Sequence, residues 1–314
     1  MIKSSYTKND IQTFLSNKLN SNIKLSPVIE GMDSQVYSYA FDGKDYIIRI
    51  NPNLEGFRKD EYAYKHFNSD IIPIPKIVEY GKYNDTHYYC ISEKVKGITY
   101  EDSPENVIIK LLPDITKIKQ AINNIDISNT SGYGVFDSQT KNAPYNTNKE
   151  YTSSVLKNDF EKIKTFDFID SELLDSALKT FQELLEFIPE TRALLHGDFG
   201  NNNIIVAEDE SKFSAVIDWD CAAYGDPLET VAGAYFWSNW LLCADKVWHY
   251  WKEIYQNTPH FNEIIACYSL KDGLAELYEN AIDKDFETID YVQNRIREIL
   301  NKYYNLGDIN KKYY

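Results

Sequence analysis

The first hundred residues alternate apolar and polar positions in short runs, a pattern typical of β-strands. Four such runs form two pairs: residues 35–41 with 45–50, and residues 77–80 with 88–95. Asp42-Gly43 joins the first pair and favours a two-residue hairpin turn, because both turn positions need a positive φ. Between the pairs, residues 55–67 predict a helix, which the proline-rich segment 71–75 ends. The pattern therefore predicts an antiparallel sheet with one inserted helix.

Beyond Gly97 the spacing of apolar residues becomes helical. Residues 105–125 predict a helix interrupted by Pro113, and residues 171–188 place their apolar side chains on one helical face. Residues 130–148 are rich in Gly, Ser, Asn and Thr and predict a long surface loop. Three short apolar runs, typical of strands, follow at residues 193–195, 204–206 and 213–217. The second part of the chain is thus predicted to be mainly helical.

Composition narrows the classes of partner. The chain has 314 residues, enough for about two domains, and its hydrophobic content of 43% is that of a globular protein. Its net charge is −15, which argues against a nucleic-acid partner or a polybasic membrane anchor. The same charge is compatible with a cationic small-molecule substrate, although many acidic proteins use charge for solubility alone.

The cysteines and apolar segments indicate a compartment. None of the four cysteines forms a C-x-x-C pair, and the N-terminal residues 1–16 lack the apolar core of a signal peptide. The most apolar stretch, residues 231–244, is too short to span a bilayer, and the five histidines show no metal-ligand spacing. We therefore expect a cytoplasmic monomer with no membrane partner.

Two acidic motifs carry the candidate chemistry. The first, residues 194–205, places a polar loop between two apolar runs, with Asp198 and Asn203 five residues apart. This is the spacing of a kinase catalytic loop, in which the aspartate meets the substrate hydroxyl and the asparagine holds magnesium. The second is Asp218, which ends the apolar run 213–217 and suits a hard cation that prefers oxygen ligands. Singly these are common turn residues, but their joint spacing favours a catalytic role.

Residues 198–200 read Asp-Phe-Gly, which also spells the metal-binding motif of protein kinases. His196 before them and Asn203 after them instead indicate the catalytic loop, which leaves the metal role to Asp218. We expect His196 to orient this loop by hydrogen bonds rather than to act as a base, because the adjacent carboxylate has the better spacing.

These motifs resemble those of the aminoglycoside phosphotransferase family, which shares the protein-kinase-like fold, and in particular its members that phosphorylate hygromycin B. The likeness extends over roughly residues 27–280, with further segments in the same order and with similar spacing. The segments are residues 55–60, 72–75, 89–92, 97–99, 130–134, 196–203 and 215–229, followed by 236–237.

The resemblance implies an α+β, protein-kinase-like fold of two lobes. Residues 1–95 would form a small nucleotide-binding lobe, an antiparallel sheet with one helix. Residues 96–314 would form a larger, mainly helical lobe with the catalytic loop and the substrate site. The resemblance also implies transfer of the γ-phosphoryl group of ATP or GTP, with Mg²⁺, to a hydroxyl of a hygromycin-like aminoglycoside, and hence antibiotic resistance.

By the same resemblance, Asp198 is the catalytic aspartate, and Asn203 and Asp218 bind Mg²⁺. The residues expected to bind the nucleotide are Ser34, Arg49, Glu61, Glu93 and Val95. Arg49 stands where the family has lysine and would hold the α- and β-phosphates, with Glu61 as its partner on the following helix. The alternative is an exposed strand arginine and a separate Glu61–Lys65 helix pair.

The other nucleotide contacts depend on backbone groups. The segment 30–35 has only one glycine, Gly31, so Ser34 and backbone amides would have to cradle the phosphates. Backbone groups of Glu93 and Val95 would meet the adenine edge, although a plain linker between lobes would require the same geometry.

A polycationic acceptor predicts carboxylates near Asp198. The candidates are Asp220, Asp226, Glu229, Glu276 and Glu279, with Trp237 or Trp240 offering ring faces to a sugar. Asp226 also suits a helix start before Pro227, with Glu229 completing an arrangement like a capping box. Tryptophans are more often part of a core.

Two alternatives stay open. One is a metabolic kinase of the same fold that acts on choline, a sugar or an amino-alcohol, and the acceptor that stimulates ADP release would identify it. The other is a non-catalytic pseudokinase, which the intact Asp198, Asn203 and Asp218 argue against and Arg49 leaves open. A metal-dependent hydrolase is disfavoured, because the sequence has no clustered histidines or further carboxylate set for two metals.

Overall fold

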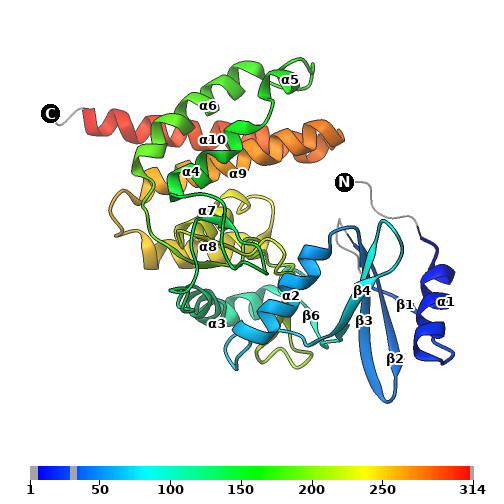
Figure 1. Ribbon diagram of the computed structural model, residues 1–314. Coiled ribbons are helices and arrows are strands. Elements are labelled where there is room, and N and C mark those ends of the chain that lie inside the picture. The colour runs from blue at the N-terminus through cyan, green and yellow to red at the C-terminus, as the bar shows by residue number, and fades with distance from the viewer. Residues whose placement is uncertain (1–5, 29–33, 312–314) are drawn as a thin grey trace.

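A five-stranded antiparallel sheet, in the order β1-β2-β3-β5-β4, forms the N-terminal lobe (Figure 1). The structure, a computed structural model, describes residues 6–28 and 34–311. The strands are β1 (Ser26–Pro27), β2 (Gln35–Phe41), β3 (Lys44–Asn51), β4 (Ile77–Lys82) and β5 (Tyr88–Glu93). β2 and β3 confirm the predicted hairpin, in which Asp42 and Gly43 have φ of 50° and 75°.

Helix α2 (Leu54–Phe67) connects β3 to β4 and confirms the predicted inserted helix. It begins at Asn53, whose side chain accepts hydrogen bonds from the amides of Glu55 and Gly56. Two of the residues that α2 buries are charged, Lys59 and Asp60, at 2% and 4% exposure. Their burial matters for the site described below.

Helix α1 (Lys8–Leu19) was absent from the sequence prediction, which had only one helix in this lobe. It packs Ile11 and Leu15 against the outer face of the sheet. Its apolar stripe is too narrow to stand out in the sequence. The missed signal is the capping box at its start, where the Thr7 side chain accepts from the amide of Asp10 and the Asp10 side chain accepts from the amide of Thr7.

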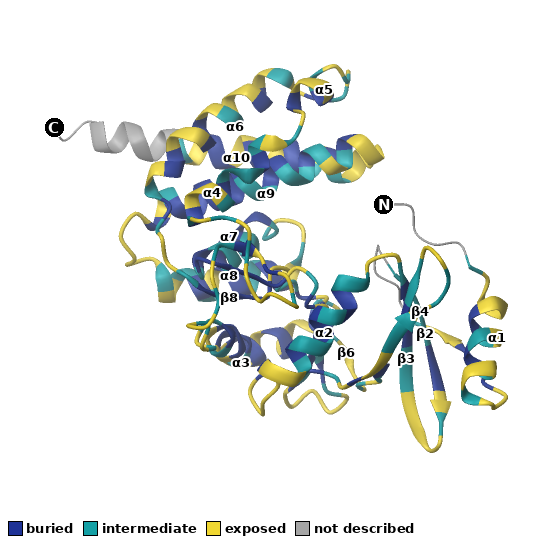
Figure 2. Cartoon of the chain, viewed as in Figure 1, coloured by how far each residue is buried: buried dark blue, intermediate teal, exposed yellow. Residues whose placement is uncertain are grey.

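The C-terminal lobe is mainly helical and is organised around one continuous cluster of buried apolar side chains. Figure 2 shows the buried residues of these helices in dark blue. Its helices are α3 (Glu105–Asn123), α4 (Asn148–Thr152), α5 (Phe160–Lys164), α6 (Ser171–Leu184), α7 (Leu228–Phe236), α8 (Leu242–Tyr255), α9 (Phe261–Asp283) and α10 (Phe286–Lys311). None of the helices among the described residues is long and apolar enough to cross a membrane.

Helix α3 differs from its prediction, because it continues through Pro113 without a break. The amide that proline lacks would have met the carbonyl of Ile109, whose side chain is 50% exposed on the outer face of the helix. The inner face, with Leu111 and Ile115 at 1% and 0% exposure, packs into the core on both sides of the proline. Tertiary packing therefore outweighs the local effect of Pro113.

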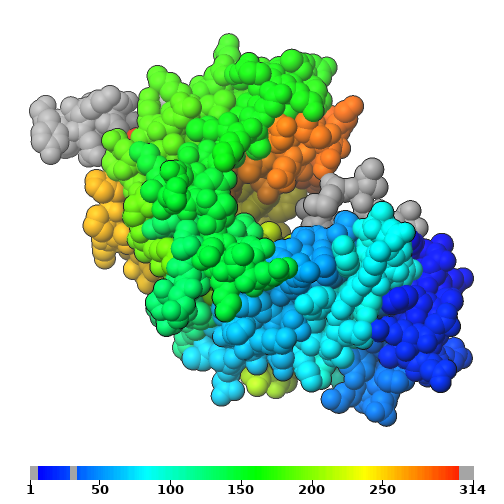
Figure 3. Space-filling view, in the orientation of Figure 1, coloured from blue at the N-terminus to red at the C-terminus, as the bar shows by residue number. Residues whose placement is uncertain are grey.

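Two small three-stranded sheets organise the chain around the acidic motifs. Their orders are β10-β9-β6 and β7-β11-β8, from strands β6 (Ile98–Thr99), β7 (Gly134–Val135), β8 (Ala193–Leu195), β9 (Ile204–Val206), β10 (Phe213–Val216) and β11 (Ala223–Gly225). β8 and β9 flank residues 196–203, and β10 leads to Asp218. The antiparallel pairing of β9 with β10 therefore brings the two motifs together. In Figure 3 the surface is hollowed between the blue N-terminal lobe and the orange helix α9.

Residues 130–148 form few regular elements, as predicted, apart from β7. Arg192 fastens this segment, because its guanidinium donates hydrogen bonds to the carbonyl of Gly132 at 2.7 Å and to the hydroxyl of Thr130 at 2.5 Å. The segment is thus held against the lobe despite its loop-like composition.

Candidate active site

The predicted catalytic loop joins Asp198 and Asn203 directly. The side-chain amide of Asn203 donates hydrogen bonds to Oδ2 of Asp198 at 2.8 Å and to its backbone carbonyl at 3.1 Å. Asn203 is 6% exposed, so its amide group is fixed by this contact. Because the NH2 group faces Asp198, the Oδ1 atom of Asn203 is left to face other ligands.

Asp218 follows β10 and lies beside this loop. The amide of Ile217 donates to the carbonyl of Asn203 at 2.9 Å, which couples the two motifs one residue before Asp218. Asp218 has a φ of 67°, a left-handed conformation that is uncommon for a residue with a Cβ and concentrates at functional sites. The side chain of Asp218 is 49% exposed, so its removal from bulk water is only partial. This partial burial and the nearby charges of Asp60, Asp220 and Asp198 raise the pKa of Asp218 to about 7, against the opposing charge of Arg49.

His196 makes the orienting contact expected of it. Its Nε2 donates to the carbonyl of Ile217 at 3.0 Å, and its ring lies 4.6 Å from that of Trp219. The side chain is 1% exposed, and burial lowers its pKa, so the neutral imidazole holds the two motifs in register. A buried, neutral histidine pointing at a backbone carbonyl is not placed to take a proton from a substrate.

Arg49 points from β3 toward the acidic motifs, but its partner differs from the prediction. Its guanidinium pairs with Asp60, not with Glu61, and lies 3.9 Å from Oδ1 of Asp218. Glu61 pairs instead with Lys65 at 2.8 Å, which is the alternative that the sequence left open. Successive helical residues point about 100° apart, so only one of two neighbouring carboxylates can face the strand.

Lys59 and Asp60 are site residues that sequence reasoning missed. Asp60 accepts from Arg49 through Oδ2 and from the backbone amide of Trp219 through Oδ1 at 2.9 Å, so it links strand β3 to the Asp218 turn. Lys59 reaches the same turn from the neighbouring helical position. The available signal was their helical spacing from the apolar residues Ala63 and Phe67, which places both charges on the buried face.

The expected nucleotide contacts are only partly described. The amide of Glu93 donates to the carbonyl of Lys76 at 2.9 Å, which leaves the carbonyl of Glu93 as the group that could meet a base. Val95 follows directly in the chain. Ser34 accepts a hydrogen bond from the side-chain amide of Asn51 at 3.0 Å, and Gly31 lies outside the described residues.

Two of the acceptor candidates are structural instead. Asp226 is 3% exposed and accepts hydrogen bonds from the amide of Leu228 at 3.3 Å and the hydroxyl of Tyr268 at 3.2 Å, so it helps to start α7 and cannot face a substrate. Glu229 forms an ion pair with Lys271 from α9 and not the expected capping box. Both carboxylates therefore have partners within the lobe, although Oε2 of Glu229 is buried without a hydrogen bond.

The ring of Trp237 stacks on that of Tyr291 at 5.4 Å with an interplanar angle of 10°, so one ring face is covered, and the residue is half-buried. Trp240 is more accessible, at 42% exposure. Burial, and then the charges of Glu279 and Asp198, raise the pKa of Glu276, so the catalytic aspartate acts on this carboxylate electrostatically. Asp220 stays beside Asp218, whose pKa it helps to raise.

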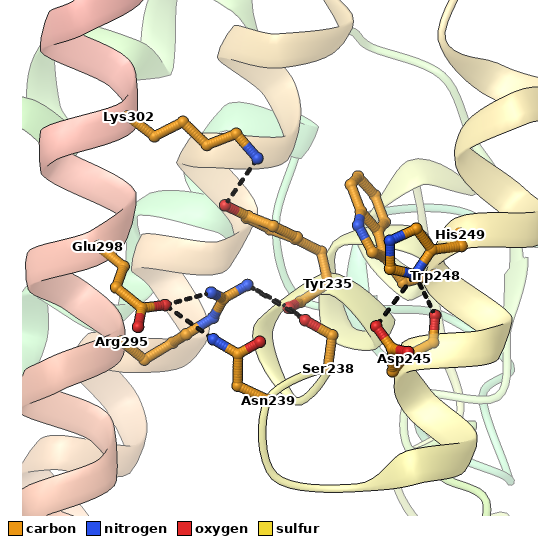
Figure 4. Close-up of a pocket in the computed structure, with 9 residues that line it drawn as sticks. All are labelled: Tyr235, Ser238, Asn239, Asp245, Trp248, His249, Arg295, Glu298 and Lys302. Atoms are coloured by element: carbon orange, nitrogen blue, oxygen red, sulfur yellow. Dashed lines mark hydrogen bonds and ion pairs between the residues drawn. The ribbon is translucent and has the colours of Figure 1, made fainter.

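A cavity of about 270 Å³ lies at the end of α7, between α8 and α10 (Figure 4). The guanidinium of Arg295 donates to the carbonyls of Tyr235 and Phe236 there and pairs with Glu298 at 2.6 Å. Glu298 also accepts from the side chain of Asn239 at 2.8 Å. These contacts end α7 and hold the loop that carries Trp237, so the buried cation in this cavity is already neutralised.

The donor set at the cleft fits a magnesium ion bound together with a nucleotide. One amide oxygen, from Asn203, and one carboxylate, from Asp218, are hard ligands of the kind Mg²⁺ prefers. Among residues 6–28 and 34–311, no group of three or more His, Cys, Asp or Glu side chains is arranged to hold a metal ion by itself. A cation here would thus rely on phosphate oxygens and water for its remaining ligands.

Comparison with known proteins agrees with this geometry. Residues 24–256 match the model of the phosphotransferase enzyme family. The hygromycin-B 4-O-kinase of Escherichia coli is 32% identical over 303 residues, 96% of this chain and 87% of that protein. The crystal structure of aminoglycoside phosphotransferase APH(4)-Ia superposes with a TM-score of 0.86 at 30% identity, covering 94% of this chain and 99% of that one. A thermostable variant of that enzyme in ternary complex with AMP-PNP and hygromycin B gives a TM-score of 0.84 at 31% identity, covering 93% and 98%.

Proposed function

The chain belongs to the phosphotransferase enzyme family, and on that premise we propose that it phosphorylates a hydroxyl group of an aminoglycoside antibiotic related to hygromycin B. The single observation that carries the proposal is the convergence of Asp198, Asn203, Asp218 and Arg49 on one cleft in a chain of this family. ATP or GTP would supply the γ-phosphoryl group. Residues 1–95 would bind the nucleotide, and residues 96–314 would carry the catalytic loop and bind the acceptor.

Asp198 would orient the acceptor. The amide of Asn203 fixes one carboxylate oxygen of Asp198, so the other can accept a hydrogen bond from the acceptor hydroxyl. As the new oxygen–phosphorus bond forms and the bond from phosphorus to the β,γ-bridging oxygen breaks, the hydroxyl proton passes to Asp198. The transition state of phosphoryl transfer is loose, so this positioning contributes more than a strong base would.

Asn203 and Asp218 would hold Mg²⁺, which when bound neutralises phosphate charge. Arg49 would place a further positive charge beside the phosphates, because Asp60 orients its guanidinium toward Asp218. Asp220 and Glu276 are the carboxylates that remain for a cationic acceptor. All of these groups come from one chain, so we expect the monomer to be active, in the cytoplasm where both nucleotides are available.

The test is coupled ADP or GDP release from the purified protein with ATP or GTP, across hygromycin B, kanamycin, choline and a simple sugar. Release that depends on an aminoglycoside supports the proposal. Release stimulated by choline or the sugar instead identifies a metabolic kinase, and tight nucleotide binding without any acceptor-dependent release identifies a non-catalytic protein.

Asp198→Asn tests the role of the carboxylate. Asparagine keeps an oxygen that can accept from Asn203, so folding and nucleotide affinity should be unchanged, while kcat should fall about 100- to 10,000-fold. The matched control is Asp85→Asn, because the Asp85 side chain is 98% exposed and pairs with Lys82 rather than with a residue of the candidate site. Turnover by Asp198→Asn within tenfold of the control would refute the assignment.

A further inference from the structure

Lys59 is a buried cation that bridges the two lobes. It lies on α2 at 2% exposure, and its ammonium donates hydrogen bonds to the carbonyls of Asp220 at 2.6 Å and Ala222 at 3.1 Å. The ring of Phe136, from the 130–148 segment, lies 4.8 Å from the same ammonium. Three segments that are distant in sequence therefore meet at this side chain.

The partners of Lys59 are unusual for a buried charge. Within the part of the chain that the structure describes, Lys59 forms no ion pair with a carboxylate, and both hydrogen bonds go to the backbone of one turn. Burial lowers the pKa of Lys59 to about 8, and the charges of Asp220, Glu55 and Asp137 act on it only from a distance. Burying an ammonium without a carboxylate in direct contact is costly, and an apolar residue of similar volume would fill the same space at lower cost. The two hydrogen bonds to backbone carbonyls, rather than the packing of the side chain, are therefore what lysine provides at this position and an apolar residue could not.

The turn held in this way is the one that carries Asp218. Asp60 accepts a hydrogen bond from the amide of Trp219, and Lys59 donates hydrogen bonds to the carbonyls of Asp220 and Ala222. These two adjacent residues of α2 therefore bind the turn near its beginning and at its end. The helix also packs closely here, because a Cβ added to Gly56 would lie only 3.1 Å from Cβ of Asp220. α2 thus fixes the backbone on which the left-handed Asp218 depends.

We propose that Lys59 is a positioning residue for phosphoryl transfer, whose ammonium holds the turn of residues 218–222 so that Asp218 faces the cleft together with Arg49. The effect of Lys59 on phosphoryl transfer rests on the proposed function, whereas the contact of Lys59 with the turn does not. Without the ammonium, two carbonyls of the turn lose their donor, and Asp218 is no longer held at a fixed distance from Asn203 and Arg49. The first property to weaken should be the binding of nucleotide that depends on magnesium.

The test measures the affinity of the full-length protein for a fluorescent ADP analogue as a function of Mg²⁺ concentration, together with kcat and the nucleotide KM where turnover is found. Lys59→Met keeps the length and apolar stem of the side chain and removes the donors. We expect the Mg²⁺ concentration at half-maximal binding to rise about tenfold or more, with nucleotide affinity in EDTA unchanged. Lys59→Arg keeps charge and donors and should restore part of the Mg²⁺ response.

The matched control is Lys110→Met, because Lys110 also donates to a backbone carbonyl, that of Glu210 at 2.8 Å, but on the exposed surface. A folded Lys59→Met protein with the Mg²⁺ response of this control overturns the proposal, even if its melting temperature has changed. If Lys59→Met does not fold, the same Mg²⁺ titration is made with Lys59→Gln, which keeps an amide donor. A weakened Mg²⁺ response would again support the proposal, and the response of the control would again overturn it. A wild-type protein without acceptor-dependent turnover would count against the proposed function alone, because the binding titration does not depend on an acceptor.

Discussion

Replacing Gly197 with alanine tests how strictly the contact between the two acidic motifs is set. Gly197 has a φ of 84°, and a Cβ added to it would lie 1.9 Å from the carbonyl oxygen of Cys221 and 2.4 Å from its carbonyl carbon. Cβ atoms essentially never approach other atoms to less than 3.0 Å, so the catalytic loop and the Asp218 turn must separate by about 1 Å. One methyl group thus acts as a wedge between the proposed base and the proposed metal ligand.

Two magnitudes follow for Gly197→Ala. A left-handed conformation costs a residue with a Cβ about 1–2 kcal/mol, so the free energy of unfolding should fall by at least that amount. A displacement of about 1 Å between reacting groups costs about 100-fold in rate, so kcat should fall by about that factor. Thermal unfolding and coupled ADP release measure the two effects separately.

Gly43→Ala is the matched control. Gly43 also has a positive φ, of 75°, but nothing lies within 4 Å of the added Cβ. The Gly43→Ala variant should lose about 1–2 kcal/mol of stability because of its backbone conformation alone and should keep wild-type turnover. If Gly197→Ala turned over as fast as Gly43→Ala, the close contact with Cys221 would have no bearing on the reaction, and the reasoning would be refuted.

Two further predictions concern charges at the site. Arg49→Met leaves the buried carboxylate of Asp60 without its cation and should lower the free energy of unfolding by about 3–5 kcal/mol in urea, whereas Arg49→Lys should retain part of it; equal losses would contradict the pairing. The pKa of Asp218, raised from 3.8 to about 7, means that the folded, metal-free protein keeps a proton that the unfolded chain releases. Stability should therefore fall as pH rises from about 4 to 7. In EDTA, the free energy of unfolding of Asp218→Asn should increase relative to that of the wild type between pH 5 and pH 8. If the difference between the two proteins did not change with pH, the raised pKa of Asp218 would be excluded as the cause.

Features encoded over short stretches of sequence could be predicted. The hairpin at Asp42-Gly43 follows from a turn type that only a few residue pairs favour. The contact between Asp198 and Asn203 follows from their spacing within one loop between two strands. In each case the chain between the partners is too short to allow many other arrangements.

Features that depend on the rotation of a helix or on distant segments could not be predicted. Glu61 was the expected partner of Arg49, but the orientation of α2 turns the neighbouring Asp60 toward β3 and Glu61 toward Lys65. Asp226 and Glu229 match an acidic acceptor wall by composition, but Tyr268 and Lys271 of α9 engage them. Partners more than forty residues away along the chain leave no local pattern.

The attachment of α2 to the Asp218 turn has a consequence for how nucleotide enters and leaves. Further attachments lie nearby: the amide of Val216 donates to the carbonyl of Pro73 at 2.7 Å, and the amide of Ser138 donates to the side chain of Glu55 at 2.6 Å. Gly97 in the connecting chain is pressed so closely on Val206 that an added Cβ would lie 1.9 Å from its carbonyl oxygen. Because these segments are all fastened to the C-terminal lobe, we expect the outer strands of the sheet to move most when the cleft opens, while the groups around Asp60 hardly move.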